Sequence, residues 1–526
     1  MSQAAFVPPA PLQGSARLWG TIALSAATFM NVLDSSIANV SLPSIAGDLG
    51  VSPNQGTWVI TSFGVANAIA LPLTGWLSQR FGQVRLFMAS VLLFVLTSWL
   101  CGLAPNMATL IGMRALQGFV AGPMMPLAQT LLLSSYPPAL AGMAMALWAM
   151  TTLVAPVMGP LLGGWITEQT HWGWIFFINI PVGILAAFIT WTIYHKRETQ
   201  TRKLPIDSVG LGLLVLAVST LQIMLDKGKD LDWFSSPEVT VLAIVSAIAF
   251  AFLIAWELTD DHPVIDLRLL KVRNFLTGTL SLSVAYSLFM GNLVLLPLWL
   301  QQYMGYTSIQ AGMLLAPVGL LAIVFSPFVG KNVQKFDTRA LATFAFLVFA
   351  LVLWMRSQFS TLHTFEVLMI PTIIQGVALA FFFIPLTTLI LGGLPPEKIP
   401  SASGLSSFAR IVGGSFGTSI AITVWQDRAA MHHAELAELV NRGSYATQAA
   451  LANFDAAGMG REQALAMINR MVDQQAFTLA ANDIFLGSSA IFILLIPLVW
   501  LARPIRAKAA GGAQSKAAAE AAAAAH

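Results

Sequence analysis

The segment WGTIALSAATFMNVLDSSIANV, from Trp19 to Val40, decides the class of this protein. As a helix rising about 1.5 Å per residue, it is long enough to cross the roughly 30 Å hydrocarbon core of a bilayer. Asp34 lies two-thirds of the way along it, where a carboxylate costs roughly 2.5 to 3.5 kcal/mol to insert. Because charges at that depth are rare and commonly functional, Asp34 favours a transport role for the chain.

The composition of the whole chain agrees with a membrane location. Of its 526 residues, 56% are hydrophobic and only 10% are charged, which is the balance of an integral membrane protein. About fourteen apolar segments follow one another, so we predict an all-α protein with about fourteen transmembrane helices. The segments lie at 19–40, 58–77, 86–104, 108–132, 141–166, 174–194, 208–226, 239–257, 275–300, 310–330, 340–355, 367–392, 405–425 and 484–503.

The positions of the basic residues predict the orientation. Most of the 27 Lys and Arg fall in connections on the side of the N-terminus, with the densest cluster at 196–203. The positive-inside rule therefore places both termini in the cytoplasm. The same residues are spread too thinly for a nucleic-acid surface. Cys101 is the only cysteine, which excludes a disulfide framework and a thiolate metal cluster.

The chain shows signs of an internal duplication. Gln117-Gly118 recurs as Gln375-Gly376, and a four-residue pattern recurs with identical spacing. The pattern is Pro72, Gly75, Arg80 and Phe81, repeated as Pro327, Gly330, Lys335 and Phe336. It predicts two six-helix halves, 19–194 and 275–503, joined by a linker at 195–274 that carries two inserted helices. Chance matches in so biased a composition are the alternative.

One long connection, 426–483, is predicted to lie outside the cytoplasm within the second half. Leu465, Ile468 and Val472 recur in it at helical spacing, which indicates an amphipathic helix. A connection of this length is either functional or partly disordered. The tails 1–18 and 504–526 are predicted to be cytoplasmic, and the second is alanine-rich and of low complexity.

Four stretches resemble motifs of the major facilitator superfamily, in particular of its fourteen-span drug:proton antiporters. They are Leu33–Pro43, Gly75–Arg85, Leu110–Gly118 and Gly159–Gly164, although Gln79 stands where the second motif usually has an Asp. The resemblance implies a major facilitator fold of two six-helix halves plus two inserted helices. It also implies a proton-driven antiporter that exports hydrophobic drugs and toxic compounds across the bacterial inner membrane by alternating access.

Four further stretches resemble the inner-membrane pumps of three-part multidrug exporters. They are Gly56–Phe63, His171–Asn179, Asp232–Phe234 and Met431–Glu435. This resemblance implies lipophilic small molecules and protons as cargo and no cofactor besides the proton gradient. As partners it implies a periplasmic adaptor of the EmrA type and an outer-membrane channel of the TolC type.

Asp34 and Arg114 are the leading candidates for proton coupling. Each lies about six residues, roughly 9 Å, from the outer end of its span, so the two charges share a depth and can neutralise each other. Protonation of Asp34 or the arrival of a cationic substrate would release the pair, whereas a static ion pair is the structural alternative. The resemblance adds Gln117 and Asn39 as supporting residues.

Two further sets of residues follow from the motifs, together with one isolated charge. The antiporter motif comprises Pro156, Gly159, Pro160, Gly163 and Gly164, which helix packing alone would also explain. The cytoplasmic gating loop comprises Gly75, Arg80, Gly82 and Arg85. Arg410 is a possible second-half charge, or else a side chain that extends to the membrane interface.

Other classes of function find less support. The pairs Gly228-Lys229 and Gly330-Lys331 lack the following Ser or Thr of a phosphate-binding loop, so export driven by ATP binding to this chain is not expected. The spans offer no nucleophile with a base, and no metal-ligand set of matched spacing, so neither an enzyme nor a metal site is predicted. The remaining rivals are an exporter of a specific metabolite or siderophore and a transport-inactive membrane sensor or scaffold.

Overall fold

A computed structural model describes residues 10–504, apart from 203–204, 261–262, 334 and 442. The outermost parts of both predicted tails, 1–9 and 505–526, lie outside the described residues. Within the described part the regular structure is helical, without a β-strand. Thirteen helical segments are long and apolar enough to cross a membrane. The helix Ala141–Gln169, with 29 residues, makes a fourteenth, in agreement with the sequence prediction of about fourteen.

The first half runs from α1 to α9. Its fourth span is divided into α5 and α6 at Gly122 and Pro123, since a proline has no backbone N–H to continue the helical ladder. The helices are α1 (Gly14–Asp48), α2 (Pro53–Gly56), α3 (Trp58–Phe81), α4 (Gln83–Gly102), α5 (Met107–Ala121), α6 (Met124–Ser135), α7 (Ala141–Gln169), α8 (Trp174–Phe177) and α9 (Asn179–Tyr194).

The two inserted helices and the second half follow. The inserted pair is α10 (Ser208–Gly228) and α11 (Pro237–Thr259). The second half comprises α12 (Arg273–Gln302), α13 (Ser308–Asn332), α14 (Thr338–Arg356), α15 (Phe365–Leu391), α16 (Ile399–Leu439), α17 (Tyr445–Ala456) and α18 (Arg461–Trp500).

The two halves are packed in corresponding ways. In the first, α1 packs on α7 and α9 while α3 packs on α5, and in the second, α12 packs on α16 and α18 while α13 packs on α15. The repeated glycines make equivalent contacts, because a side chain at Gly118 would overlap the backbone of Phe63 and one at Gly376 would overlap the backbone of Pro317. The small residues therefore allow the same close helix approach in each half.

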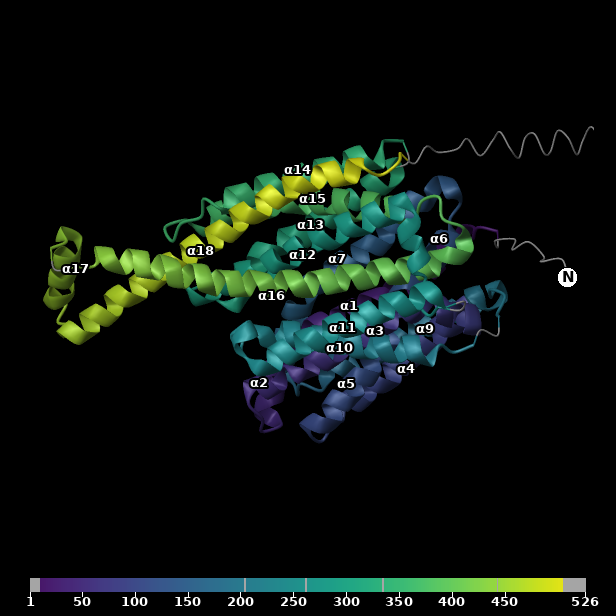
Figure 1. Cartoon of the computed structure of the whole chain (residues 1–526), viewed down its shortest axis with the longest axis horizontal. Helices are drawn as coiled ribbons and strands as arrows, with labels where there is room; N and C mark the ends of the chain where they lie inside the picture. Colours follow the sequence, from purple (N-terminus) through teal and green to yellow (C-terminus); the bar gives the residue numbers. More distant parts are fainter. Residues whose placement is uncertain (1–9, 203–204, 261–262, 334, 442, 505–526) are drawn as a thin grey trace, which may run out of the picture.

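The halves meet at one end of the bundle. We call the end where α1 begins and α18 ends the terminal end, and the opposite end the far end (Figure 1). At the terminal end, α7 crosses α13 so closely that a Cβ atom on Gly330 would lie 2.7 Å from the carbonyl oxygen of Gly142. Nearby, Ser403 of α16 donates a hydrogen bond to Gln129 of α6. The contact between the halves is thus tight at the terminal end.

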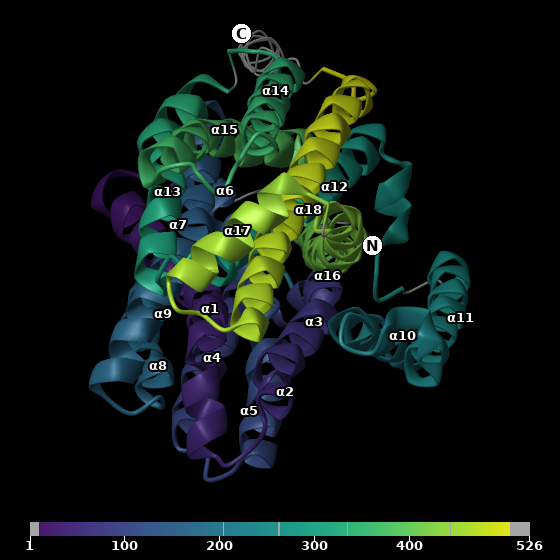
Figure 2. The same cartoon turned by 90° about the vertical axis from the view of Figure 1, so that its left-hand side faces the viewer.

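The inserted helices lie at the side of the bundle, where α10 packs on α11 and also reaches α3 and α16 (Figure 2). Towards the far end, Thr61 of α3 donates to the Asp226 carboxylate, and Ser419 of α16 donates to the carbonyl of Leu225 at 2.6 Å. The indole of Trp233 donates to Thr423 of α16 at 2.7 Å. The outer part of α10 is therefore bonded to both halves.

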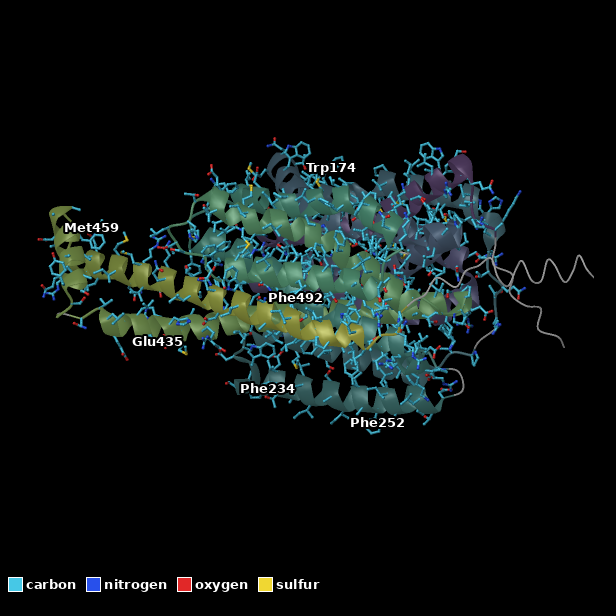
Figure 3. The ribbon with its side chains drawn as sticks, turned by 90° about the horizontal axis from the view of Figure 1, so that it is seen from above. Trp174, Phe234, Phe252, Glu435, Met459 and Phe492 are labelled. Atoms are coloured by element: carbon cyan, nitrogen blue, oxygen red, sulfur yellow. The ribbon has the colours of Figure 1, made fainter. Side chains whose placement is uncertain are left out.

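The surface carries large apolar side chains. Phe234 and Phe252 of the inserted pair and Trp174 of α8 are more than half exposed and project outward (Figure 3). In water such a surface would be costly, whereas hydrocarbon accepts it. The exposed apolar belt therefore agrees with a bilayer around the bundle.

The segment 426–483 is mainly helical. Helix α16 continues to Leu439 and α18 begins at Arg461, with the short helix α17 between them in the chain. The segment is therefore a helical extension beyond the far end (Figures 1 and 3). The apolar residues of the predicted amphipathic helix are only partly buried, because Ile468 is buried while Leu465 is 46% exposed. We call residues 426–483 the helical extension.

Candidate functional site

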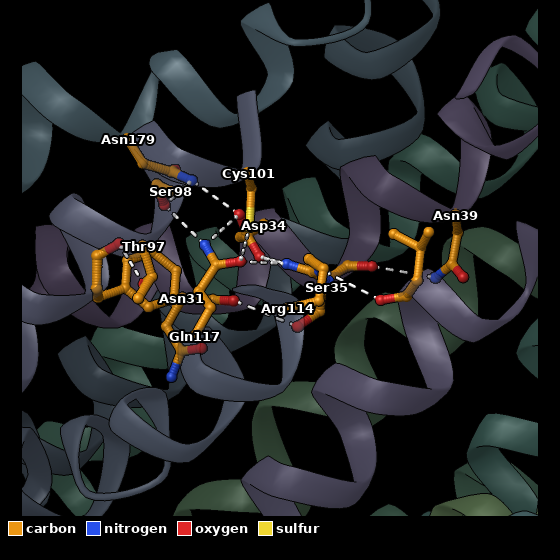
Figure 4. A network of polar contacts seen from close by, with 12 residues as sticks. Asn31, Asp34, Ser35, Asn39, Thr97, Ser98, Cys101, Arg114, Gln117 and Asn179 are labelled. Atoms are coloured by element: carbon orange, nitrogen blue, oxygen red, sulfur yellow. Dashed lines mark hydrogen bonds and ion pairs between the residues drawn. The ribbon is translucent and has the colours of Figure 1, made fainter. Parts of the chain in front are cut away.

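A polar network surrounds Asp34 inside the first half (Figure 4). The Asp34 carboxylate is fully buried and accepts hydrogen bonds on both oxygens. Its Oδ2 lies 2.5 Å from Nη1 of Arg114, and its Oδ1 accepts from Asn179 at 2.8 Å and from Gln117 at 3.1 Å. One cation thus neutralises the carboxylate and two amides donate hydrogen bonds to it, as a charge buried in an apolar environment requires.

Arg114 is held on several sides. Its Nε donates to the carbonyl of Val59 at 3.1 Å, and its Nη1 donates to Gln117 at 2.6 Å. The guanidinium carbon lies 4.2 Å from the ring centre of Phe63 and 5.5 Å from that of Phe176, both favourable cation–π positions. Its Nη2, however, has no hydrogen-bond partner among the described residues. A water molecule or a rearranged acceptor could occupy that position.

The neutral members of the network come from two further helices. Gln117 donates to Ser98 of α4 at 2.7 Å, and Asn179 of α9 reaches the same hydroxyl at 3.2 Å. The Cys101 thiol lies 3.6 Å from the side-chain oxygen of Gln117. The network therefore joins α1, α4, α5 and α9, and a change in the Asp34–Arg114 contact would alter hydrogen bonds on all four helices.

The structure brings together Asp34, Arg114 and Gln117 from the predicted residues, but places Asn39 elsewhere. The Asn39 side chain is exposed and donates to the carbonyl of Ser35 on its own helix. Asn179 and Ser98 take part instead, and the sequence analysis missed both as site residues. The only indication for Asn179 in the sequence is that it ends the stretch His171–Asn179, which resembles a part of known exporters. Nothing in the sequence indicates Ser98.

The antiporter motif lies where α7 packs on α1. A side chain at Gly159 would overlap Ser36, whose hydroxyl donates to the carbonyl of Pro156 at 3.1 Å. Gly163 packs on Ile37 in the same way, whereas Gly164 faces open space. The side chain of Pro160 lies outside the described part of the chain. The motif thus positions the helix that carries Asp34.

The predicted gating loop lies at the terminal end. Gly75 has no room for a side chain because Ser401 of the second half packs against it, and Gly82 has a φ of 89°, which favours glycine. The Arg80 guanidinium lies over the ring of Trp76, and the side chain of Arg85 is exposed.

An acidic residue that the sequence analysis did not single out lies beside this loop. The Glu198 carboxylate accepts from the backbone N–H groups of Val84 at 3.1 Å and Arg85 at 2.8 Å. It therefore caps the start of α4. Gln79 makes a separate contact in the same loop. Its backbone carbonyl, and not its side chain, accepts a hydrogen bond from the backbone N–H of Arg202.

The second half contains a buried cation that the sequence analysis placed outside the spans. Arg356, at the end of α14, is 1% exposed and donates to Gln375 at 2.6 Å and Thr372 at 3.2 Å. Gln375 thus contacts an arginine just as Gln117, its predicted repeat partner, does. No carboxylate lies within ion-pair distance of Arg356 among the described residues. The two halves therefore share a glutamine–arginine contact and differ in the acid.

Arg410 is also buried, at 5% exposure, rather than extended to an interface. Its guanidinium lies 4.9 Å from the ring centre of Tyr286 and beside the sulfur of Met125 from the first half. It lines a small cavity together with Gln129 and Trp148, which also belong to the first half. The predicted second-half charge therefore lies at the contact between the halves.

Comparisons with known proteins agree with this architecture. The sequence profile of the Major Facilitator Superfamily matches residues 24–418. The chain is 50% identical to the multidrug export protein EmrB of Escherichia coli over 503 residues, which cover 95% of this chain and 98% of that protein. It is 48% identical to the fatty acid resistance protein FarB of Neisseria gonorrhoeae over 95% of this chain and 99% of that protein.

A solved structure shows the same fold. The human organic anion transporter MFSD10 superposes with a TM-score of 0.59 over 93% of this chain and all of that one, at 14% sequence identity. At this identity the likeness supports the arrangement of helices alone.

Proposed function

The chain belongs to the major facilitator superfamily, and we propose that it exports lipophilic drugs and other toxic compounds in exchange for protons. The observation that carries this proposal is the buried Asp34–Arg114 pair within a network that joins four helices. A multidrug exporter of 50% identity over nearly the full length supports the substrate class. The proton gradient supplies the energy, and the proposal requires no cofactor.

Asp34 carries the proton in this mechanism. When a proton reaches the carboxylate, its charge no longer attracts Arg114, so the guanidinium turns to Gln117 and the Val59 carbonyl, which it already contacts. The hydrogen bonds from Gln117 and Asn179 to Asp34 weaken at the same step. Because these residues belong to different helices, the proton changes the relative stability of two packings of the first half.

Alternating access follows from the contact between the halves. With both termini in the cytoplasm of a bacterial cell, the terminal end is the cytoplasmic end, and its tight crossings close that side. The described conformation is then the outward-facing one, from which substrate leaves and a proton enters. Return to the inward-facing state requires α7 and α13 to separate near Gly142 and Gly330.

The partners in this proposal are a periplasmic adaptor of the EmrA type and an outer-membrane channel of the TolC type. The inner membrane is then the location of the chain, and the helical extension reaches into the periplasm. In this extension α17 has no buried residue, and Tyr445 is 86% exposed. Such a surface is suited to contact with another protein.

Drug-driven proton release from the purified protein in liposomes tests the proposed exchange. We expect that Asp34→Asn abolishes drug-driven proton movement, because an amide does not take up a proton, while the variant still inserts, because the amide oxygen still accepts a hydrogen bond from Arg114. Normal exchange by Asp34→Asn at equal protein content would exclude Asp34 as the proton carrier. Absence of any drug-driven proton flux in the wild type would favour the sensor or scaffold alternative.

A further inference from the structure

Two carboxylates meet where the inserted pair begins and ends, at the terminal end of the bundle. Asp207 immediately precedes α10, and Glu257 lies in the last turn of α11. Their side chains are buried, with residue exposures of 8% and 1%. Gly210 makes room for both, because a Cβ atom there would overlap Oδ2 of Asp207 and lie 2.8 Å from Oε1 of Glu257. The two acids therefore face the same small space.

The hydrogen bonds of the two acids are unequal. Asp207 accepts from the backbone N–H of Gly210 at 2.8 Å and so caps α10, and the indole of Trp256 donates to both of its oxygens, at 3.0 and 3.1 Å. Glu257 accepts through Oε2 from the backbone N–H of Ile265 at 3.0 Å. Its Oε1 is buried and has no hydrogen-bond partner among the described residues. The charge of Asp207 is thus compensated, whereas a charge on Glu257 is not.

The other charges that act on Glu257 are also negative. They are the carboxylates of Asp207 and Asp260, and no cation of the described part of the chain lies within ion-pair distance. Arg268 and Lys271, in the short helix after α11, are exposed, and Arg268 donates to the carbonyl of Asp260 at 3.5 Å. A buried carboxylate beside like charges favours its neutral form, because protonation removes both the repulsion and the cost of desolvation.

These environments assign the two acids different states. We propose that Glu257 and Asp207 form a second proton-binding site of the chain, apart from Asp34, in which Glu257 holds a proton at neutral pH and Asp207 stays ionised. The carboxylate of Glu257 takes up the proton on Oε1, on the side where Gly210 leaves space for Asp207. Uptake of the proton therefore replaces a repulsion between the two side chains with an attraction.

The site lies between segments that are bonded to different halves. Before α10, the carbonyl of Pro205 accepts from the indole of Trp76 on α3 at 3.2 Å. After α11, Asp266 pairs with Lys398, next to the start of α16, at 3.2 Å. Loss of the proton separates the adjoining ends of α10 and α11 and so acts on both connections. In the proposed orientation this end faces the cytoplasm, so the site responds to cytoplasmic pH.

Infrared difference spectra of the purified protein in nanodiscs, recorded as a function of pH, test the proposal. A protonated carboxyl group has a C=O stretching band of its own, and we expect one that is present at neutral pH and lost in alkaline buffer. Glu257→Gln should remove this band, and its amide keeps the shape of the neutral acid. Asp207→Asn should shift the loss of the band to lower pH by about one unit, because the repelling charge is gone.

Glu238→Gln is the matched control on the same helix. Glu238 lies at the opposite end of α11, is exposed and pairs with Lys227 at 2.8 Å, so its replacement should leave the band unchanged. A band that survives in Glu257→Gln, the absence of such a band in the wild type, or an unshifted pH dependence in Asp207→Asn would each overturn the proposal.

Spin labels test the effect on packing. In a chain whose Cys101 is replaced by Ala, labels on Val209→Cys and Leu258→Cys, both exposed, should move apart in alkaline buffer. The added Glu257→Gln should make their separation independent of pH, and a wild-type separation that does not change with pH would overturn the proposed link to helix packing.

These measurements do not depend on the proposed export function, since they need neither drug nor proton gradient. The band of Glu257 should persist in Asp34→Asn. If that variant exchanges protons normally while the band behaves as expected, the role of Asp34 alone is wrong. If the band is absent while drug-driven proton flux is intact, the second proton site alone is wrong.

Discussion

At the scale of single residues, helix geometry explains which predicted side chains join the Asp34 network. Residues advance by about 100° each, so Arg114 and Gln117 lie on one face of α5, only about 60° apart. Asn39 is five residues beyond Asp34 and points about 140° away from it. The sequence could identify Asp34 and Arg114 because ionisable residues are rare within spans. Neutral residues such as Asn179 are common there, so their contacts could not be predicted.

Asn179 and Asn39 form a matched pair for mutation. We expect Asn179→Ala to reduce drug-driven proton exchange severely, because it removes donors to both Asp34 and Ser98. Loss of a hydrogen bond to a charged group corresponds to about 1.5–3 kcal/mol. Asn39→Ala should exchange at the wild-type rate, since its side chain bonds only to the Ser35 carbonyl. Flux measurements in liposomes would refute this assignment if the two variants behaved in the reverse order.

At the scale of helices, the sequence predicts a helix wherever an apolar segment is long enough to cross the membrane. It does not predict the polar parts of helices that extend beyond the membrane. The outer parts of α16 and α18 are rich in charged and polar residues, so their low hydropathy suggested a connection. Ion-pair contacts join the two helices there, such as Arg428 to Asp483 at 2.6 Å and His432 to the same carboxylate at 2.8 Å. Such tertiary contacts join residues distant in sequence, which no local pattern reveals.

The crossing of α7 and α13 gives a prediction at the same scale. Gly142→Val would force side-chain atoms into the backbone of Gly330, and such overpacking costs about 1–3 kcal/mol in the closed state. The population should therefore shift towards conformations open at the terminal end and narrower at the far end. In a chain whose own Cys101 is replaced by Ala, spin labels on Ala108→Cys and Leu362→Cys, both exposed at the far end, would report a shorter distance.

Gly212→Ala is the control for this experiment, because Gly212 lies on α10 with open space around its Cα atom. It should leave the distribution of distances unchanged. An unaltered distribution in Gly142→Val would show that this crossing does not control the closed state.

For the whole molecule, the halves resemble each other in packing and differ in charge. The first half buries a neutralised acid, whereas the second buries Arg356 and Arg410, neither of which has a carboxylate partner among the residues that the structure describes. Gln117 and Gln375 each accept a hydrogen bond from an arginine at 2.6 Å, so the duplication inferred from sequence extends to side-chain contacts. The two halves therefore differ in how their buried charges are compensated.

The helical extension predicts a separation between transport and assembly. Replacing residues 440–460, which include α17, by a short Gly-Ser turn removes an exposed element that packs mainly on α18. We expect exchange in liposomes to persist, while co-purification with the periplasmic adaptor and drug resistance of cells are lost. Intact co-purification would exclude α17 as the docking element. Loss of exchange in liposomes would instead show that the extension supports the transport bundle itself.

The position of Cys101 has a practical consequence for following the proton. It is the only thiol of the chain and is buried within 3.6 Å of the Gln117 oxygen, next to the groups that hold Asp34. In the described conformation the buried thiol is closed to an alkylating reagent, so we expect it to react only when this network opens. The labelling rate of this single thiol in the unmodified chain should therefore measure how often the network around Asp34, the proposed proton carrier, opens.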